Sequence, residues 1–302
     1  MIKNFNCKQG FERIDREFIE KCDREFEELL AESVAELCHK KESRVLGLTG
    51  PTCSGKTTAA KKLISYLGDE QKRVVTVSLD DFFKDTFSRE MLKDVDLTKL
   101  DFDSPDTLDT ELLGGFVDEL FNKGSAEKPI FNFLTGERDK WERLECDDDD
   151  VVLFEGIQVL YPSVLSVIEA HGGSVLCVRP SSGIKVGDHL FEPDFIRLCR
   201  RLVRDNNFRG ADAELTLALW GGVRKNEDEN IYPHMHKCDV MIDTTLSYEM
   251  NVLAPYLRRM LSEMSPSSEY VETARNILLA AEGINGIDSS YVSKDSLYRE
   301  FV

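Results

Sequence analysis

Residues 46–60 read LGLTGPTCSGKTTAA, and this stretch determines which fold class the chain adopts. It matches the pattern G-x-x-x-x-G-K-[ST] through Gly50, Gly55, Lys56 and Thr57. In such a loop the glycines let backbone N–H groups surround phosphate oxygens, the lysine reaches the β- and γ-phosphates, and the threonine hydroxyl binds Mg²⁺. The stretch therefore predicts a site for a nucleoside triphosphate.

Both flanks of the glycine loop have the secondary structure that the motif requires. The preceding residues 43–50 (SRVLGLTG) are short and β-rich, which predicts a strand. The following residues 56–68 place Ala59, Leu63 and Leu67 on one helical face, and the N-terminus of that helix faces the anion. We therefore expect the whole loop, called the P-loop from here on, to bind ATP. Its residues are Gly50, Pro51, Thr52, Cys53, Ser54, Gly55, Lys56, Thr57 and Thr58.

The rest of the chain alternates predicted strands with predicted helices. The strands fall at 73–83 (RVVTVSLDDFF), 150–161 (DVVLFEGIQVLY), 173–180 (GSVLCVRP) and 238–246 (CDVMIDTTL). This alternation is typical of an α/β protein with a parallel sheet covered by helices on both faces. Together with the P-loop it predicts the P-loop nucleoside triphosphate hydrolase fold.

Composition excludes several classes of protein. The chain has 302 residues and a formal net charge of −18, which argues against a polyanionic partner such as nucleic acid. No apolar run approaches about 18 residues, so we expect no membrane span. The N-terminus lacks the apolar core of a signal peptide, and the eight cysteines contain no C-x-x-C pair. These features predict a cytoplasmic protein with reduced, mostly buried thiols and a small-molecule substrate.

Carboxylates at two strand ends favour phosphate transfer over simple hydrolysis. Asp80 and Asp81 end the predicted strand at 73–83, and Glu155 ends the next one. Ligands bind outside the carboxyl ends of parallel strands, so these groups should converge with Lys56 near the γ-phosphate. One carboxylate would take the proton of an acceptor hydroxyl while another holds Mg²⁺. Capping of the next helix is a serious alternative role for Asp81 and a weaker one for Asp80.

A run of arginines lies at 194–210, DFIRLCRRLVRDNNFRG. Four of them share one helical face at spacings i, i+3, i+4 and i+7: Arg197, Arg200, Arg201 and Arg204. Asp205 alone does not balance their charge, so the pattern favours a phosphate clamp over a plain surface helix. Arg209 follows, on what we expect to be a mobile lid.

The order of several motifs resembles the uridine kinase and phosphoribulokinase family of P-loop kinases, and within it the uridine kinase-like nucleoside kinases. The resemblance covers about residues 43–302. The motifs are GPTCSGKTT (50–58), SLDDFF (78–83), FDSPDTLD (102–109), FNFLTGER (131–138), VVLFEG (151–156) and IRLCRRLVRDNNFRG (196–210).

This resemblance implies a role for each matching residue. Asp80 would be the catalytic base that activates a sugar 5′-hydroxyl, and Asp103 would hold the ribose hydroxyls. Thr57, Glu155 and Asp80 would hold Mg²⁺. Phe131 and Phe133 would line the base pocket, with Arg138 also assigned to the substrate. The arginine-rich lid would supply Arg201 and Arg204 to catalysis and Arg197 and Arg209 to the nucleotide.

Three positions depart from the pyrimidine kinases of the family. Phe131 lacks a hydroxyl, Gly136 stands where a histidine contacts the pyrimidine, and Ala211 stands where another arginine occurs. A pocket that hydrogen-bonds a base discriminates through that bond, so its loss relaxes or redirects the choice of base. We therefore expect weak selection among bases.

The expected activity is ATP-dependent transfer of the γ-phosphate to the 5′-hydroxyl of a nucleoside. The alternatives are a kinase of a sugar or another small hydroxyl compound, as in phosphoribulokinase, and a noncatalytic nucleotide-binding regulatory protein. We divide the chain into an N-terminal helical extension (1–42), a kinase core (43–265) with its lid region at about 181–235, and a C-terminal helix and tail (266–302). The extension is either packed on the core, which we favour, or a dimerisation arm, so a homo-oligomer stays open.

Overall fold

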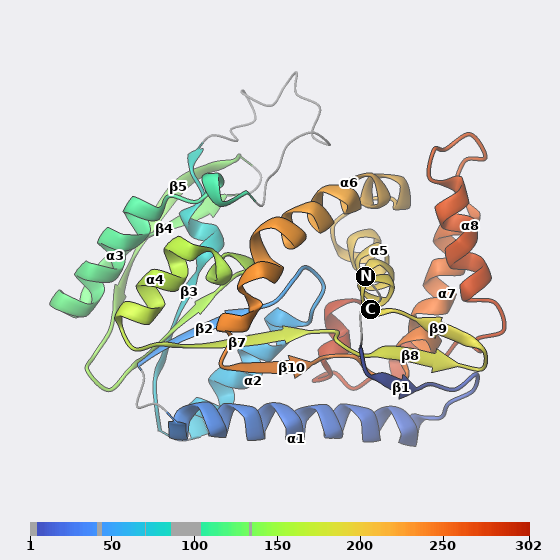
Figure 1. The fold of residues 1–302 in the computed structure, drawn as a ribbon, viewed down its shortest axis with the longest axis horizontal. Coiled ribbons are helices and arrows are strands. Elements are labelled where there is room, and N and C mark those ends of the chain that lie inside the picture. Colours follow the sequence, from blue (N-terminus) through green and yellow to red (C-terminus); the bar gives the residue numbers. More distant parts are fainter. Residues whose placement is uncertain (1–4, 41–43, 70, 86–103, 133–134) are drawn as a thin grey trace.

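The computed structural model describes residues 5–40, 44–69, 71–85, 104–132 and 135–302. Its centre is a five-stranded sheet of parallel strands in the order β10-β7-β2-β6-β3 (Figure 1). The strands are β2 (Val45–Thr49), β3 (Val74–Ser78), β6 (Val151–Glu155), β7 (Ser174–Arg179) and β10 (Val240–Asp243). The predicted α/β fold with a parallel sheet is confirmed.

The central strands are apolar on both faces because helices cover both sides of the sheet. In β6, Val151 and Leu153 belong to one hydrophobic core, whereas Val152 and Phe154 belong to the other. This division follows from the alternation of side chains along a strand. The continuous apolar run that predicted this strand is therefore explained by two separate cores.

Two helices cover each face of the sheet. Figure 1 shows α1 (Arg16–Lys40) and α2 (Lys56–Asp69) below the sheet, and α3 (Thr110–Lys123) and α4 (Pro162–Ala170) above it. The sequence predicted an N-terminal helical extension at 1–42, and the structure has the helix α1 within that segment. Its buried stripe packs into the first core, as favoured above, through Ile19, Cys22, Phe26, Leu30, Val34 and Leu37. The division of the chain into three segments stays a prediction.

Further elements surround one end of the sheet. They are α5 (Pro193–Phe208), α6 (Ala213–Asn226), α7 (Glu249–Ser262) and α8 (Val271–Ala280). A small sheet joins β1 (Cys7–Gln9), β8 (Gly183–Val186) and β9 (His189–Phe191), and an antiparallel hairpin joins β4 (Ser125–Asn132) to β5 (Glu137–Glu145). The sequence analysis predicted neither, because β1 and β9 are three residues long and β5 is almost entirely exposed and polar.

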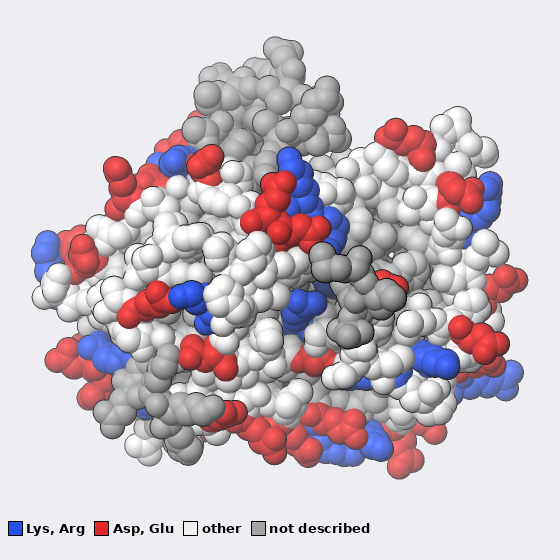
Figure 2. All heavy atoms as spheres, in the orientation of Figure 1, with Lys and Arg blue, Asp and Glu red and all other residues white. Residues whose placement is uncertain are grey.

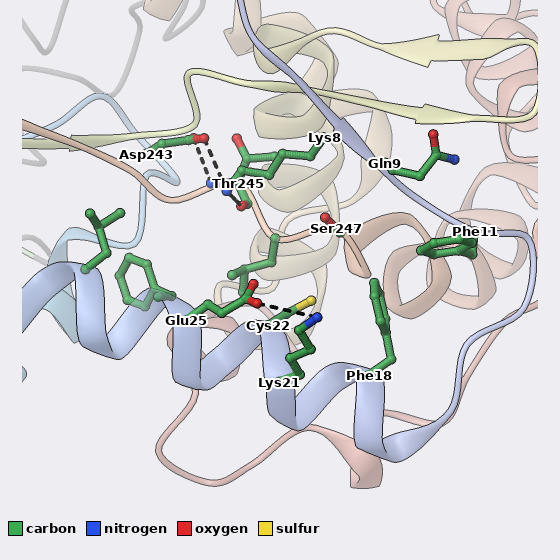
Figure 3. Close-up of a pocket in the computed structure, with 13 residues that line it drawn as sticks. Lys8, Gln9, Phe11, Phe18, Lys21, Cys22, Glu25, Asp243, Thr245 and Ser247 are labelled. Atoms are coloured by element: carbon green, nitrogen blue, oxygen red, sulfur yellow. Dashed lines mark hydrogen bonds and ion pairs between the residues drawn. The ribbon is translucent and has the colours of Figure 1, made fainter.

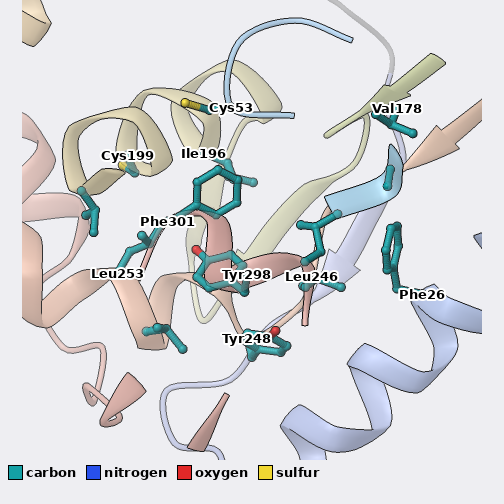
Figure 4. Close-up of a cluster of buried hydrophobic side chains, with 14 of the residues drawn as sticks. Phe26, Cys53, Val178, Ile196, Cys199, Leu246, Tyr248, Leu253, Tyr298 and Phe301 are labelled. Carbon is teal, nitrogen blue, oxygen red and sulfur yellow. The ribbon is translucent and has the colours of Figure 1, made fainter. Parts of the chain in front are cut away.

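The end of the chain folds back into the first core. A short 3₁₀ helix, η9 (Leu297–Glu300), contacts α2. Figure 4 shows Tyr298 and Phe301 packed among Ile196, Leu253 and other buried side chains, close to Cys53 of the P-loop. The C-terminal residues are therefore part of the same packed core as α2 and α5.

Charge on the surface is uneven. Acidic side chains gather along the lower edge of Figure 2, where α1 lies, with Lys and Arg side chains among them. Within the described part of the chain, no helix is both long and apolar enough to cross a membrane.

Candidate active site

The P-loop connects β2 to α2, and Lys56 is the first residue of that helix. Cys53 adopts a left-handed backbone conformation with φ of 58°. For a residue with a side chain this conformation costs about 1–3 kcal/mol, so surrounding contacts must hold it. Thr57 is exposed and Lys56 is half-buried, which leaves both side chains accessible to a ligand.

The predicted carboxylates converge at the ends of the strands. Glu155 pairs in register with Leu48 of β2 on one side and Ser78 of β3 on the other, so it lies between the P-loop strand and the strand that leads to Asp80. Burial raises the pKa of Glu155, the charge of Lys56 lowers it, and the charge of Asp80 raises it further. The structure thus places both Lys56 and Asp80 within electrostatic reach of Glu155.

Asp80 and Asp81 have different environments. Both lie on the 3₁₀ helix η1 (Leu79–Phe82) that follows β3. Asp81 forms an ion pair with buried Lys128 of β4 and accepts a hydrogen bond of 3.1 Å from the backbone N–H of Phe131. Asp81 therefore connects the β4–β5 hairpin to η1. The helix-capping role that was kept as an alternative for Asp81 is corrected by these contacts.

Asp80 has a partner that the sequence analysis missed. Gln158, on the 3₁₀ helix η5 (Ile157–Leu160), donates from Nε2 to Oδ1 of Asp80 at 2.7 Å. Its side chain is 1% exposed, so the amide is held in place by packing. The signal was present in the sequence, because Gln158 is a lone polar residue in the apolar run IQVLY that follows Glu155.

The predicted substrate residues occupy the neighbouring region. Phe131 is buried, and its ring packs edge-on against Phe83 at 5.6 Å between centroids. The Arg138 guanidinium donates to Asp109 at 2.9 Å and to Asp85 at 3.3 Å, so it already has carboxylate partners. Asp103 and Phe133 lie outside the described residues.

Gly136 sits in the turn between β4 and β5. Its φ is 75°, and its N–H donates to the carbonyl of Asn132 at 2.7 Å. A histidine would be strained in this backbone conformation, so the turn accounts for the glycine that the sequence shows here.

The first two arginines of α5 have partners that the sequence argument lacked. Arg197 binds Glu227 with Nη1 to Oε2 at 3.0 Å, and Arg200 binds Glu249 at 2.7 and 2.6 Å. All four side chains are almost completely buried. The sequence argument counted Asp205 as the only carboxylate that opposes these arginines. This premise is wrong, because Glu227 and Glu249, which lie 30 and 49 residues further along the chain, neutralise Arg197 and Arg200. The assignment of Arg197 to the nucleotide stays a prediction, and a direct phosphate contact would require its present bonds to change.

The other three arginines share one carboxylate. Asp205 lies 3.2 Å from Arg201, 2.7 Å from Arg204 and 3.7 Å from Arg209. Burial raises the pKa of the Cys53 thiol, and the charges of Arg204 and Arg201 act against that rise. These two arginines therefore lie near the P-loop, where the carboxylates of Asp205 and Glu300 act against their positive charge.

The donor set fits Mg²⁺. The described residues hold no cluster of three or more His, Cys, Asp or Glu side chains. Mg²⁺ does not need one, since it is bound by one or two carboxylates together with water and phosphate oxygens. Burial raises the pKa of Glu155, and a divalent cation beside it would favour its charged form.

A cavity of about 480 Å³, away from the P-loop, lies between α1, β1 and the segment after β10 (Figure 3). Its lysines face carboxylates: Lys8 lies 3.3 Å from Asp243, and Lys21 lies 3.7 Å from Glu25. Because these cations are already paired, we place the phosphate site at the P-loop and not here.

Comparison with known proteins agrees with this geometry. The model of the Phosphoribulokinase / Uridine kinase family matches residues 45–250. A chloroplastic uridine/cytidine kinase of Arabidopsis thaliana is 32% identical over 200 residues, which cover 66% of this chain and 37% of the relative. A uridine kinase of Lactobacillus helveticus is 27% identical over 199 residues, which cover 66% of this chain and 85% of the relative. The chain thus spans little more than a third of the length of the plant relative.

One solved structure shares the fold. It is a candidate fructose transport system kinase from Silicibacter, with a TM-score of 0.51 and 19% identity, covering 70% of this chain and 98% of that one. At this identity the likeness concerns the fold alone.

Proposed function

The chain belongs to the phosphoribulokinase and uridine kinase family, and from this premise we propose that it transfers the γ-phosphate of Mg²⁺-ATP to the 5′-hydroxyl of a nucleoside. The observation that carries the proposal is the position of Asp80. It follows β3, lies within electrostatic reach of Glu155, on which Lys56 also acts, and is oriented by Gln158 at 2.7 Å. Among the described residues, Gln158 binds one oxygen of the Asp80 carboxylate, and we assign the other oxygen to the acceptor hydroxyl.

In the proposed reaction Asp80 accepts the proton of the 5′-hydroxyl as the oxygen attacks the γ-phosphorus. Lys56 binds the β- and γ-phosphate oxygens, and Arg201 and Arg204 compensate the negative charge that spreads over the transferred group. Mg²⁺, held by Thr57 and by Glu155 or Asp80, would neutralise phosphate charge and orient the chain of phosphates. The attacking and leaving oxygens are then aligned by binding alone, which is the main contribution a protein makes to this chemistry.

We further propose that selection among bases is relaxed. Phe131 and Gly136 supply neither a hydroxyl nor an imidazole at the positions where pyrimidine kinases of the family have them. Phe131 is packed against Phe83, so this part of the pocket offers an apolar wall. An apolar wall rejects an incorrect ring weakly, whereas a site built to hydrogen-bond a base rejects it strongly.

ADP release tests the assignment of the acceptor. The purified protein is supplied with Mg²⁺-ATP and uridine, cytidine, adenosine, guanosine, inosine, their 2′-deoxy forms, and a panel of sugars and sugar phosphates. We expect release that depends on a nucleoside and extends beyond uridine and cytidine, with Asp80→Asn as the blank. Strong preference for uridine and cytidine would refute the relaxed pocket. Activity with sugars and none with nucleosides would refute the nucleoside assignment.

A further inference from the structure

Three consecutive carbonyl groups of the P-loop are each bound by a side chain from outside the loop. Arg197 donates from Nε to the Thr52 carbonyl at 3.1 Å, and Arg200 donates from Nη1 to the Cys53 carbonyl at 3.2 Å. The Thr244 hydroxyl donates to the Ser54 carbonyl at 2.7 Å. All three donors are buried. Two of them are arginines that the charge pattern had suggested for phosphate.

These bonds determine where the loop's N–H groups point. A trans peptide is planar, so the carbonyl of one residue and the N–H of the next point in opposite directions. Anchoring the carbonyls of Thr52, Cys53 and Ser54 on one side therefore directs the following N–H groups to the other side. One of these, the Ser54 N–H, closes a turn with the Pro51 carbonyl at 3.2 Å. The three donors Arg197, Arg200 and Thr244, called the anchors from here on, thus also hold Cys53 in its left-handed conformation.

The anchors are themselves held by residues from several elements. Arg200 forms two hydrogen bonds with Glu249 at the start of α7, and its guanidinium carbon lies 5.0 Å from the ring centre of Phe301 and 5.8 Å from that of Tyr298. Both aromatic residues are fully buried.

The C-terminal segment also touches the loop directly. A Cβ atom placed on Gly55, whose φ is 89°, would lie 2.4 Å from Cδ1 of Leu297. Leu297, Tyr298 and Phe301 lie beyond residues 45–250, the part that the family model matches. The support of the P-loop therefore includes a segment outside the family-matched core.

We propose that Arg197, Arg200 and Thr244 are positioning residues that set the P-loop in its phosphate-binding shape, and that residues 297–301 support them. The inference rests on the proposed function insofar as the P-loop binds a nucleotide. It assigns Arg197 and Arg200 to the carbonyl side of the loop and leaves Arg201 and Arg204 as the candidates for phosphate contact.

Thr244 and Thr245 provide a matched pair for the test. Both hydroxyls are fully buried and donate to a backbone carbonyl, Thr244 to Ser54 at 2.7 Å and Thr245 to Ser182 at 3.0 Å. Valine keeps the shape of threonine and removes the hydroxyl. Each valine removes one hydrogen bond to a backbone carbonyl, and Thr244→Val also removes the oxygen that accepts from Nη1 of Arg200 at 3.4 Å. Both variants should therefore lower the melting temperature, while only Thr244→Val removes an anchor of the P-loop.

Two measurements are made on each variant and on Thr244→Ser, which keeps the hydroxyl. The first is amide hydrogen exchange of residues 53–56 without any ligand, and the second is the Kd for Mg²⁺-ATP. For Thr244→Val we expect P-loop exchange to be about tenfold faster and ATP binding to be about tenfold weaker, the size of one lost hydrogen bond. Thr245→Val should stay within about twofold of the wild type in both, and Thr244→Ser should recover most of the loss.

Unchanged exchange in Thr244→Val, or equal effects of both valine variants, would overturn the proposal. The exchange experiment needs neither ATP nor an acceptor, so its outcome is independent of the proposed reaction. If the wild type fails to phosphorylate any nucleoside while Thr244→Val still opens the loop, the proposed function fails and the positioning role remains.

Discussion

Replacing Asp80 by asparagine should abolish most of the activity without unfolding the protein. Asparagine has nearly the same shape and retains an oxygen that accepts the 2.7 Å hydrogen bond from Gln158, so the local structure is preserved. What is lost is the ability to accept a proton. Positioned acids and bases contribute about 10²- to 10⁴-fold to the rate, so kcat should fall by about 100-fold or more.

Asp81→Asn is the matched control, because the two residues are adjacent on η1. Asp81 is committed to Lys128 and to the backbone N–H of Phe131. Lys128 is 6% exposed and keeps only Glu142, at 3.1 Å, as a second carboxylate partner. Loss of a buried charged hydrogen bond costs about 2 kcal/mol, which corresponds to a decrease of roughly 3 °C in melting temperature for a chain of this size.

Steady-state kinetics, ATP titration and thermal unfolding of both variants test this pair. Asp80→Asn should keep its melting temperature and its affinity for Mg²⁺-ATP while losing kcat. Asp81→Asn should lose stability and keep kcat within severalfold at a temperature where it is folded. Normal turnover in Asp80→Asn together with inactive, folded Asp81→Asn would show that the two roles are reversed.

Three further predictions concern the remaining site residues. Burial raises the pKa of the Glu155 carboxyl in the folded protein above its value in the unfolded chain, so the free energy of unfolding decreases as the pH rises above that unfolded value. Glu155→Gln should therefore raise the melting temperature of the ligand-free protein at pH 7.5. The gain should vanish near pH 4. An unchanged difference across that pH range would contradict it. Arg201→Gln should lower kcat by about 100-fold. The loss of stability should be small, because Asp205 keeps its ion pairs with Arg204 and Arg209. A large decrease in melting temperature with unchanged kinetics would refute this. Asp103→Ala should raise KM for ribonucleosides and leave ATP binding unchanged, and a variant with wild-type KM would remove Asp103 from the ribose site.

The candidate site residues that the sequence could indicate depend on local sequence. The P-loop is a contiguous motif, Glu155 is the last residue of the apolar strand β6, and Asp80 lies two residues after β3. Parallel strands place their carboxyl ends at one edge of the sheet, so these residues converge without any knowledge of long-range contacts. The strands and the helix α1 were likewise predictable from apolar periodicity.

The parts that were missed depend on partners distant in the sequence. Nothing near Arg197 or Arg200 indicates that Glu227 and Glu249 neutralise them, and the buried pairs form only when α5 packs against the π-helix turn at 227–231 and α7. The C-terminal residues Tyr298 and Phe301 look like part of a polar tail, yet the fold buries them. A periodicity argument treats a helix in isolation, and α5 is enclosed on several sides.

Identification of the phosphorylated product tests the central claim most directly. The wild-type protein is incubated with Mg²⁺-ATP and its preferred acceptor, and the products are separated and assigned by mass spectrometry and ³¹P NMR. We predict one nucleoside 5′-monophosphate formed for each ADP released, and product formation slower by about 100-fold or more with Asp80→Asn. ADP accompanied only by inorganic phosphate across the whole acceptor panel would contradict it, because the protein would then hydrolyse ATP without transferring the phosphate.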